Sequence, residues 1–161
     1  MSRLAVAVVV LALGACATRD IEPDLVDQLA AYDLVARVTE RGVVVYIPDV
    51  LFDFDSTELT AVARDQIVGV AEVIGRLAPE RTVSVEGHAD ARGTDEYNHR
   101  LSLERAQEVA TVLTGHGLEP TRVRTTGFGE SFPVQPNENP DGTDSAEGRR
   151  QNRRVEVVIE R

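Results

Sequence analysis

The segment from Thr82 to Gly115 constrains the fold most, because it joins two different periodicities through one short turn. Thr82 to Glu86 alternates apolar and polar side chains, as a half-buried strand does. The stretch GHADARGTDEYNHRLSLER, from Gly87 to Arg105, follows directly. A helix is expected from about Glu96 to Gly115, since apolar residues recur there at helical spacing. The chain must therefore turn from a strand into a long helix at this junction.

The residues before this junction predict a hairpin and another helix. Leu34 to Val38 and Val43 to Ile47 alternate around a turn that closes at Gly42. A helix capped by Thr60 should follow and end at Pro79. Its buried stripe is expected to comprise Ile67, Val70, Ala71, Ile74 and Leu77.

The residues after the junction predict two more strands and a long surface loop. A strand from Arg122 to Thr126 precedes a loop, rich in Pro, Asn, Asp and Gly, from Glu130 to Asp144. A helical turn over Gly148 to Asn152 then leads into a final strand, Val155 to Ile159. This succession predicts an α+β fold, a two-layer sandwich with one mixed β-sheet and helices packed on one face.

The N-terminus is typical of an exported lipoprotein. Leu4 to Leu13 is an apolar run, too short for the roughly 20 residues that span a bilayer but long enough for a secretory signal. Cys16, the only cysteine, follows small residues as in a lipobox. The alternative is an ordinary signal peptide with an incidental cysteine. We predict a lipoprotein signal peptide at 1–15, a lipid-anchored linker at 16–32 and one domain at 33–161.

The charge balance excludes one broad class of function. The chain has 27 acidic and 17 basic residues, a formal charge of −10. General nucleic-acid binders neutralise phosphates with a basic surface, so a nucleic-acid partner is not expected.

The junction also gathers side chains that can recognise a zwitterion. Asn98, Leu101 and Arg105 share one face of the predicted helix, beside the turn that carries Asp90. A carboxylate can bind an ammonium group, and a guanidinium can bind a carboxylate through two hydrogen bonds. The alternative is that Asp90 and Arg105 form only a salt bridge that fixes the turn to the helix.

Metal and catalytic sites are not expected. His88, Asp90 and His99 are the residues that suggest a metal, but no further ligand stands at a recognisable spacing. No nucleophile motif is present. Gly127-Phe128-Gly129 is not followed by a helix, so it predicts a turn rather than a phosphate site. No cofactor is therefore expected.

Three blocks of sequence resemble the OmpA C-terminal-like family, which includes peptidoglycan-associated lipoproteins. They are GHADARGTDEYNHRLSLERAQEV, GHGLEPTRVRTTGFGESFPV and EGRRQNRRVEVVI, and the similarity extends from about Val43 to Ile159. The resemblance implies an OmpA-like sandwich without enzymatic activity. It also implies non-covalent binding to peptidoglycan through diaminopimelate, a stem-peptide residue whose side chain ends in both an ammonium and a carboxylate.

By this resemblance, four residues of the junction form the peptidoglycan site. Asp90 would bind the ammonium of diaminopimelate, and Arg105 would bind its carboxylate. Asn98 and Leu101 would line the pocket.

The resemblance also assigns the other wall of the pocket. Phe54 and Asp55 would contact the stem peptide, and Arg153 belongs to a block near the site without an assigned role. Ala89 departs from the family, which more often has Thr there. The missing hydroxyl is expected to weaken a local hydrogen bond by roughly 0.5–1.5 kcal/mol without removing either charge of the site.

The expected role follows from the anchor and the site together. A lipid at Cys16 would anchor the protein, and Ala17 after the cysteine favours sorting of the lipoprotein to the outer membrane. The domain would then bind the cell wall on the periplasmic side. The alternative is a docking module for envelope proteins of a Tol-like system, with wall binding secondary.

Overall fold

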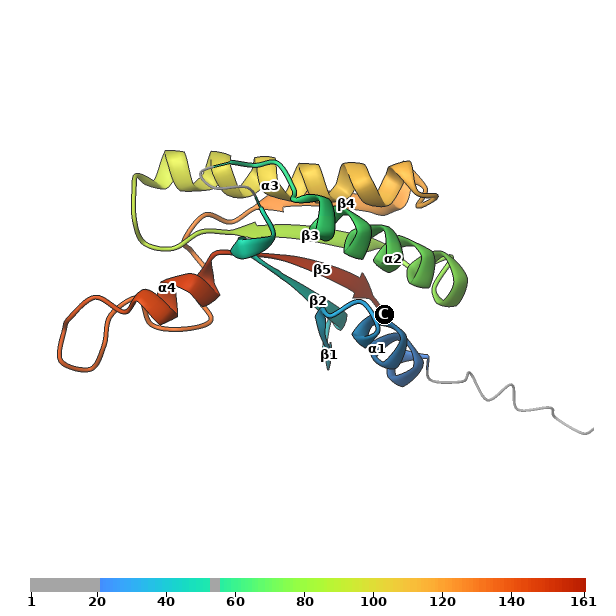
Figure 1. Ribbon diagram of the computed structural model, residues 1–161, viewed down its shortest axis with the longest axis horizontal. Helices are drawn as coiled ribbons and strands as arrows, with labels where there is room; N and C mark the ends of the chain where they lie inside the picture. Colours follow the sequence, from blue (N-terminus) through green and yellow to red (C-terminus); the bar gives the residue numbers. More distant parts are fainter. Residues whose placement is uncertain (1–20, 53–55) are drawn as a thin grey trace, which may run out of the picture.

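The computed structural model describes residues 21–52 and 56–161, in which five strands form one mixed sheet (Figure 1). The strands are β1 (Val35–Thr39), β2 (Gly42–Pro48), β3 (Val83–His88), β4 (Val123–Gly127) and β5 (Arg154–Glu160). Their order across the sheet is β1-β2-β5-β3-β4. Only β3 and β4 pair in parallel; the other neighbours are antiparallel.

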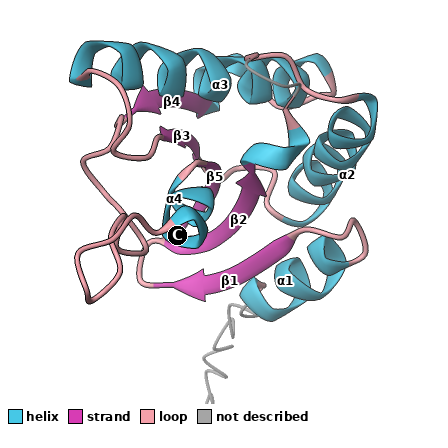
Figure 2. Cartoon of the chain, turned by 60° about the vertical axis from the view of Figure 1, so that its left-hand side comes forward, coloured by secondary structure: helices cyan, strands magenta, loops and turns pink. Residues whose placement is uncertain are grey.

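The longer helices cover one face of this sheet (Figure 2). The helical segments of the described chain are α1 (Glu22–Ala30), α2 (Ala61–Leu77), α3 (Asp95–Gly115), α4 (Ala146–Asn152) and the short 3-10 turns η1 (Asp49–Leu51) and η2 (Pro120–Arg122). Residues of α1, α2 and α3 share one core with the sheet, whereas α4 is separate from this layer and leads into β5. The predicted α+β fold is confirmed.

Strand alternation explains which face is buried against the helices. Side chains of successive residues point to opposite faces of a sheet. One set of alternate residues joins the helical core: Val43, Val45, Ile47, Val83, Val85, Val155, Val157 and Ile159.

The predicted local features are also present. The hairpin pairs Thr39 with Gly42, as expected for a turn closing at that glycine. The hydroxyl of Thr60 accepts a hydrogen bond of 3.2 Å from the amide of Ala63 and caps α2. No helix in the described residues combines the length and apolar character that a bilayer crossing needs.

Helix α1 differs from the prediction for this region. Residues 16–32 were expected to form a linker, but Glu22–Ala30 is a helix within the folded unit. Leu25 and Leu29, one turn apart, are both 0% exposed and belong to the core. The Glu22 carboxylate lies 2.9 Å from Arg161 and 3.6 Å from Arg81. A short, polar segment of this kind is a weak helix by itself, and it is stabilised by the packing of its apolar stripe on the core.

Two glycines bring α3 unusually close to the sheet. A Cβ atom on Gly87 would lie 1.8 Å from the carbonyl oxygen of Ser102, and one on Gly127 would lie 2.7 Å from that of His99. Gly87 and Gly127 are register partners at the ends of β3 and β4. The first turns of α3 therefore lie directly over the point where the chain leaves β3.

The opposite face of the sheet carries a buried polar cluster around His88. Its ring is 4% exposed and stacks on Phe128 at 5.4 Å. Burial, followed by the positive charges of Arg154 and Arg41, lowers the pKa of His88 from its ordinary value of 6.5 to about 3. The imidazole is thus neutral at physiological pH.

Helix α1 should contribute to the stability of the domain. Leu29→Ala removes a fully buried side chain, and we expect the free energy of unfolding in urea to fall by about 2–5 kcal/mol. The matched control is Asp27→Ala, an exposed position of the same helix. Equal stability of the two variants would contradict the inclusion of α1 in the core.

The buried imidazole should make folding sensitive to mild acid. Between pH 3 and 6.5 the unfolded chain binds a proton at His88 that the folded chain does not, so stability falls as pH decreases. We expect a loss of about 2 kcal/mol from this group between pH 7.5 and 5, measured by urea unfolding at each pH. His88→Gln should lack this component, while His99→Gln, at an exposed position, should retain it. If His88→Gln loses as much stability between pH 7.5 and 5 as the wild type, the loss does not come from His88.

Candidate functional site

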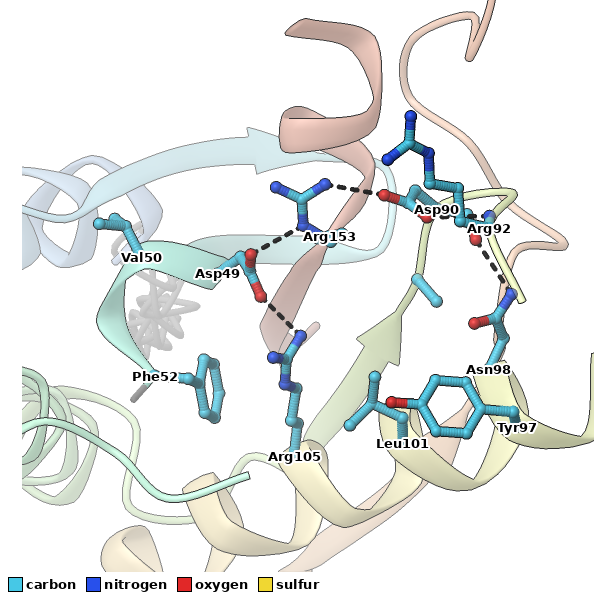
Figure 3. Close-up of a pocket in the computed structure, with 11 residues that line it drawn as sticks. Asp49, Val50, Phe52, Asp90, Arg92, Tyr97, Asn98, Leu101, Arg105 and Arg153 are labelled. Carbon is cyan, nitrogen blue, oxygen red and sulfur yellow. Dashed lines mark hydrogen bonds and ion pairs between the residues drawn. The ribbon is translucent and has the colours of Figure 1, made fainter. Parts of the chain in front are cut away.

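A pocket of about 520 Å³ opens where the turn after β3 meets α3 (Figure 3). Three regions distant in sequence form it: η1 and the residue after it, the segment from the end of β3 to α3, and the residue that joins α4 to β5. Its lining residues are Asp49, Val50, Phe52, Ala89, Asp90, Arg92, Tyr97, Asn98, Leu101, Arg105 and Arg153.

Asp90 lies at the rim of this pocket and is 6% exposed. One of its carboxylate oxygens, Oδ1, accepts a hydrogen bond of 2.9 Å from the amide of Arg92, which fixes the turn. The other, Oδ2, lies 2.7 Å from a guanidinium nitrogen of Arg153 and 3.6 Å from Nε of Arg149. The carboxylate is therefore held by one backbone amide and two cations.

Arg105 projects from α3 toward the opposite wall and is 8% exposed. Its guanidinium lies 2.6 Å from Oδ1 of Asp49 and donates to the carbonyl oxygen of Ser56. The same group lies over the ring of Phe52, 5.0 Å from its centroid. These contacts orient the positive charge along one side of the pocket.

Arg153 connects the two sides. Its Nε donates to Asp49 at 2.7 Å and its terminal nitrogen donates to Asp90 at 2.7 Å. Partial burial lowers the pKa of Arg153, but the hydrogen bonds to Asp49 and Asp90 raise it overall. Arg105, Asp49, Arg153 and Asp90 therefore form a chain of successive ion pairs across the pocket. Asp90 and Arg105 are joined through this chain and not by the direct salt bridge that was the alternative prediction.

The remaining residues predicted on α3 also line the pocket. The amide of Asn98 donates to the carbonyl oxygen of Asp90 at 3.1 Å and to Glu130 at 2.7 Å, so it ties the turn to the helix. Leu101 contributes apolar surface. Ala89 is buried, and its backbone amide donates to the carbonyl oxygen of Gly129 at 2.7 Å.

Some predicted residues lie outside the described part of the chain, and some lining residues were not predicted. Phe54, Asp55 and Cys16 belong to the first group. Asp49 and Phe52, close neighbours of Phe54, belong to the second, with Tyr97. Nothing in the sequence near Asp49 indicated its pairing with arginines far along the chain.

Comparison with known proteins identifies the family. Residues 51–152 match the OmpA family. The chain is 41% identical over 128 residues to a protein of Gloeobacter violaceus named photosystem I P700 chlorophyll a apoprotein A2, covering 77% of this chain and 14% of the relative. It is 32% identical over 127 residues to the peptidoglycan-associated lipoprotein of Agrobacterium fabrum, covering 77% of this chain and 71% of the relative.

A solved structure gives the same result for the fold. The cell wall anchor of the T6SS from Pseudomonas aeruginosa superposes with a TM-score of 0.70 at 31% identity, covering 88% of this chain and 97% of that one. The chain spans 14% to 56% of the length of several curated relatives. The family is structural rather than enzymatic, in agreement with the expectation of no catalysis. The chain belongs to the OmpA family, and the part of it that the structure describes is an OmpA-like domain.

Proposed function

We propose that this protein binds peptidoglycan non-covalently through the diaminopimelate of its stem peptide and tethers the outer membrane to the cell wall. The observation that carries the proposal is the placement of Asp90 and Arg105 on opposite sides of one pocket. Both residues line the pocket, and Asp90 is 6% and Arg105 8% exposed.

The chemistry of the pocket matches the end of a diaminopimelate side chain. That end carries an ammonium and a carboxylate on one carbon, so it needs an acid and a base on facing walls. Asp90 supplies the acid, and the guanidinium of Arg105 supplies a fork of hydrogen-bond donors for the carboxylate. Leu101 and Phe52 provide the apolar surface against which the methylene chain packs.

The internal ion pairs indicate how the ligand enters. Arg153 has a side chain that is 33% exposed, whereas that of Asp90 is 8% exposed, so the arginine is the partner that can turn toward solvent. Its departure would leave Oδ2 of Asp90 with only the longer 3.6 Å contact to Arg149 and so open one side of the carboxylate to the incoming ammonium. Arg105 is paired with the carboxylate of Asp49, so a ligand carboxylate would have to replace Asp49 at this guanidinium.

The tether requires an anchor as well as a site. The apolar run from Leu4 to Leu13 and the single Cys16 support a lipid-modified N-terminus after signal removal. Relatives named as lipoproteins, in Escherichia coli and Agrobacterium fabrum, agree with this assignment. Many weak contacts along one polymer give a strong attachment even when each site binds modestly.

Sedimentation with purified sacculi tests the site directly. We expect wild-type protein to pellet with walls that contain diaminopimelate and to remain in the supernatant with walls that contain Lys, which lacks the second carboxylate. Asp90→Ala and Arg105→Ala should each abolish most of the pelleting. Circular dichroism on the same samples checks that the variants are folded.

The controls use charges that lie away from the pocket. Asp65→Ala on α2 and Arg124→Ala on β4 remove an exposed acid and an exposed base and should pellet as wild type does. Equal binding to both wall types would overturn the role of Arg105. Co-purification with envelope proteins that survives Asp90→Ala, together with unchanged pelleting, would favour the docking alternative.

The ion pairs of the pocket should also stabilise the fold of the domain. Asp49→Asn keeps the side-chain size but removes the charge that faces Arg105 and Arg153. We expect the free energy of unfolding to fall by about 1–3 kcal/mol, because a buried guanidinium loses its ionic partner. Urea denaturation of this variant and of Glu58→Gln, at an exposed position of the same connection, measures the difference. An unchanged midpoint would show that Asp49 is dispensable for folding.

A further inference from the structure

The sheet face opposite the helices brings together three side chains that suit a metal ion. Glu86 and His88 are two residues apart on β3 and therefore share a face. Glu156 on β5 is the register partner of Glu86. One potential ligand atom from each of the three residues lies within 4.8 Å of the others, and all three residues are buried.

His88 supplies the independent sign that this cluster has room for a ligand. Neither ring nitrogen has a hydrogen-bond partner, although both are inaccessible to solvent. Buried polar atoms are normally paired, so two unpaired nitrogens on one ring call for a physical reason. The Nε2 atom lies 4.0 Å from a carboxylate oxygen of Glu156, too far for a hydrogen bond.

We propose that Glu86, His88 and Glu156 form a binding site for a divalent transition-metal ion of the Zn²⁺ type. One imidazole nitrogen with two carboxylate oxygens is a donor set that Zn²⁺ accepts, whereas Ca²⁺ and Mg²⁺ prefer oxygen alone. Tetrahedral Zn²⁺ places its ligand atoms about 3.4 Å apart, given metal–ligand distances near 2.1 Å. The three ligand atoms lie within 4.8 Å of one another, so they must approach by about 1.4 Å or less when the ion binds.

Each glutamate of the cluster is paired with an arginine, and this pairing must change when the ion binds. Arg41, on the hairpin turn, pairs with Glu86, and its side chain is 52% exposed. Arg154 is buried, pairs with Glu156 at 2.7 Å, and also donates to the carbonyl oxygens of Asn152 and Phe132. Arg41 can thus leave for solvent, while Arg154 keeps its carbonyl partners when Glu156 turns to the metal.

The imidazole is already prepared for coordination. Its stacking on Phe128 fixes the plane of the ring, and its neutral form leaves one nitrogen lone pair free. Asp90 and His99 were considered beside His88 in the sequence, and no metal site was expected from their spacing. In the structure Asp90 faces the pocket cations instead, so this cluster is separate from the proposed peptidoglycan site.

Titration with Zn²⁺ by calorimetry tests the site, using full-length protein in a Cys16→Ser background so that the lone thiol cannot contribute. We expect one ion per chain and a higher melting temperature that EDTA reverses. His88→Gln and Glu156→Gln should each weaken binding at least tenfold. Arg41→Gln should tighten it, because the competing cation is gone.

Matched controls separate this site from the rest of the molecule. His99→Gln should bind Zn²⁺ as the parent does, and so should Asp90→Ala, even though the latter is expected to lose sacculus binding. No binding by the parent, or binding unchanged in both His88→Gln and Glu156→Gln, would overturn the proposal. If His88→Gln does not fold, weaker binding by Glu156→Gln supports the site, and unchanged binding by Glu156→Gln or no gain in Arg41→Gln refutes it.

Discussion

The close approach of α3 to the ends of β3 and β4 is the constraint on which the pocket depends. Because Gly87 and Gly127 have no side chain, the helix backbone lies directly on theirs. This contact sets the height of Asn98 and Arg105 above the turn that carries Asp90. A side chain at either glycine would push α3 away from the sheet and so move Asn98 and Arg105 away from Asp90.

Most of the fold could be predicted because its elements are specified locally. The hairpin around Gly42, the Thr60 cap and the alternating strands each depend on a few neighbouring residues. Helix α1 could not be predicted in the same way. Its apolar stripe consists chiefly of Leu25 and Leu29 in a short acidic segment, and a nine-residue helix is stable only through packing on distant elements.

The same division applies to the pocket. Asp90, Asn98, Leu101 and Arg105 lie within sixteen residues of one another in sequence, so their spacing and the family resemblance indicated them. Asp49 was not found, because it meets Arg153 across 104 positions of the chain. The role of Arg153 stayed open for the same reason. The metal cluster likewise depends on a cross-strand pairing of Glu86 with Glu156 that no local pattern reveals.

The position of α1 has a mechanical consequence. If the chain is held by its N-terminus while the pocket holds the cell wall, tension enters the domain through this helix. Resistance at that end then comes from the packing of Leu25 and Leu29 and from the ion pairs of Glu22 with Arg81 and Arg161. The packing of α1 and its ion pairs would therefore bear such a load before it reached the sheet and the proposed wall-binding pocket.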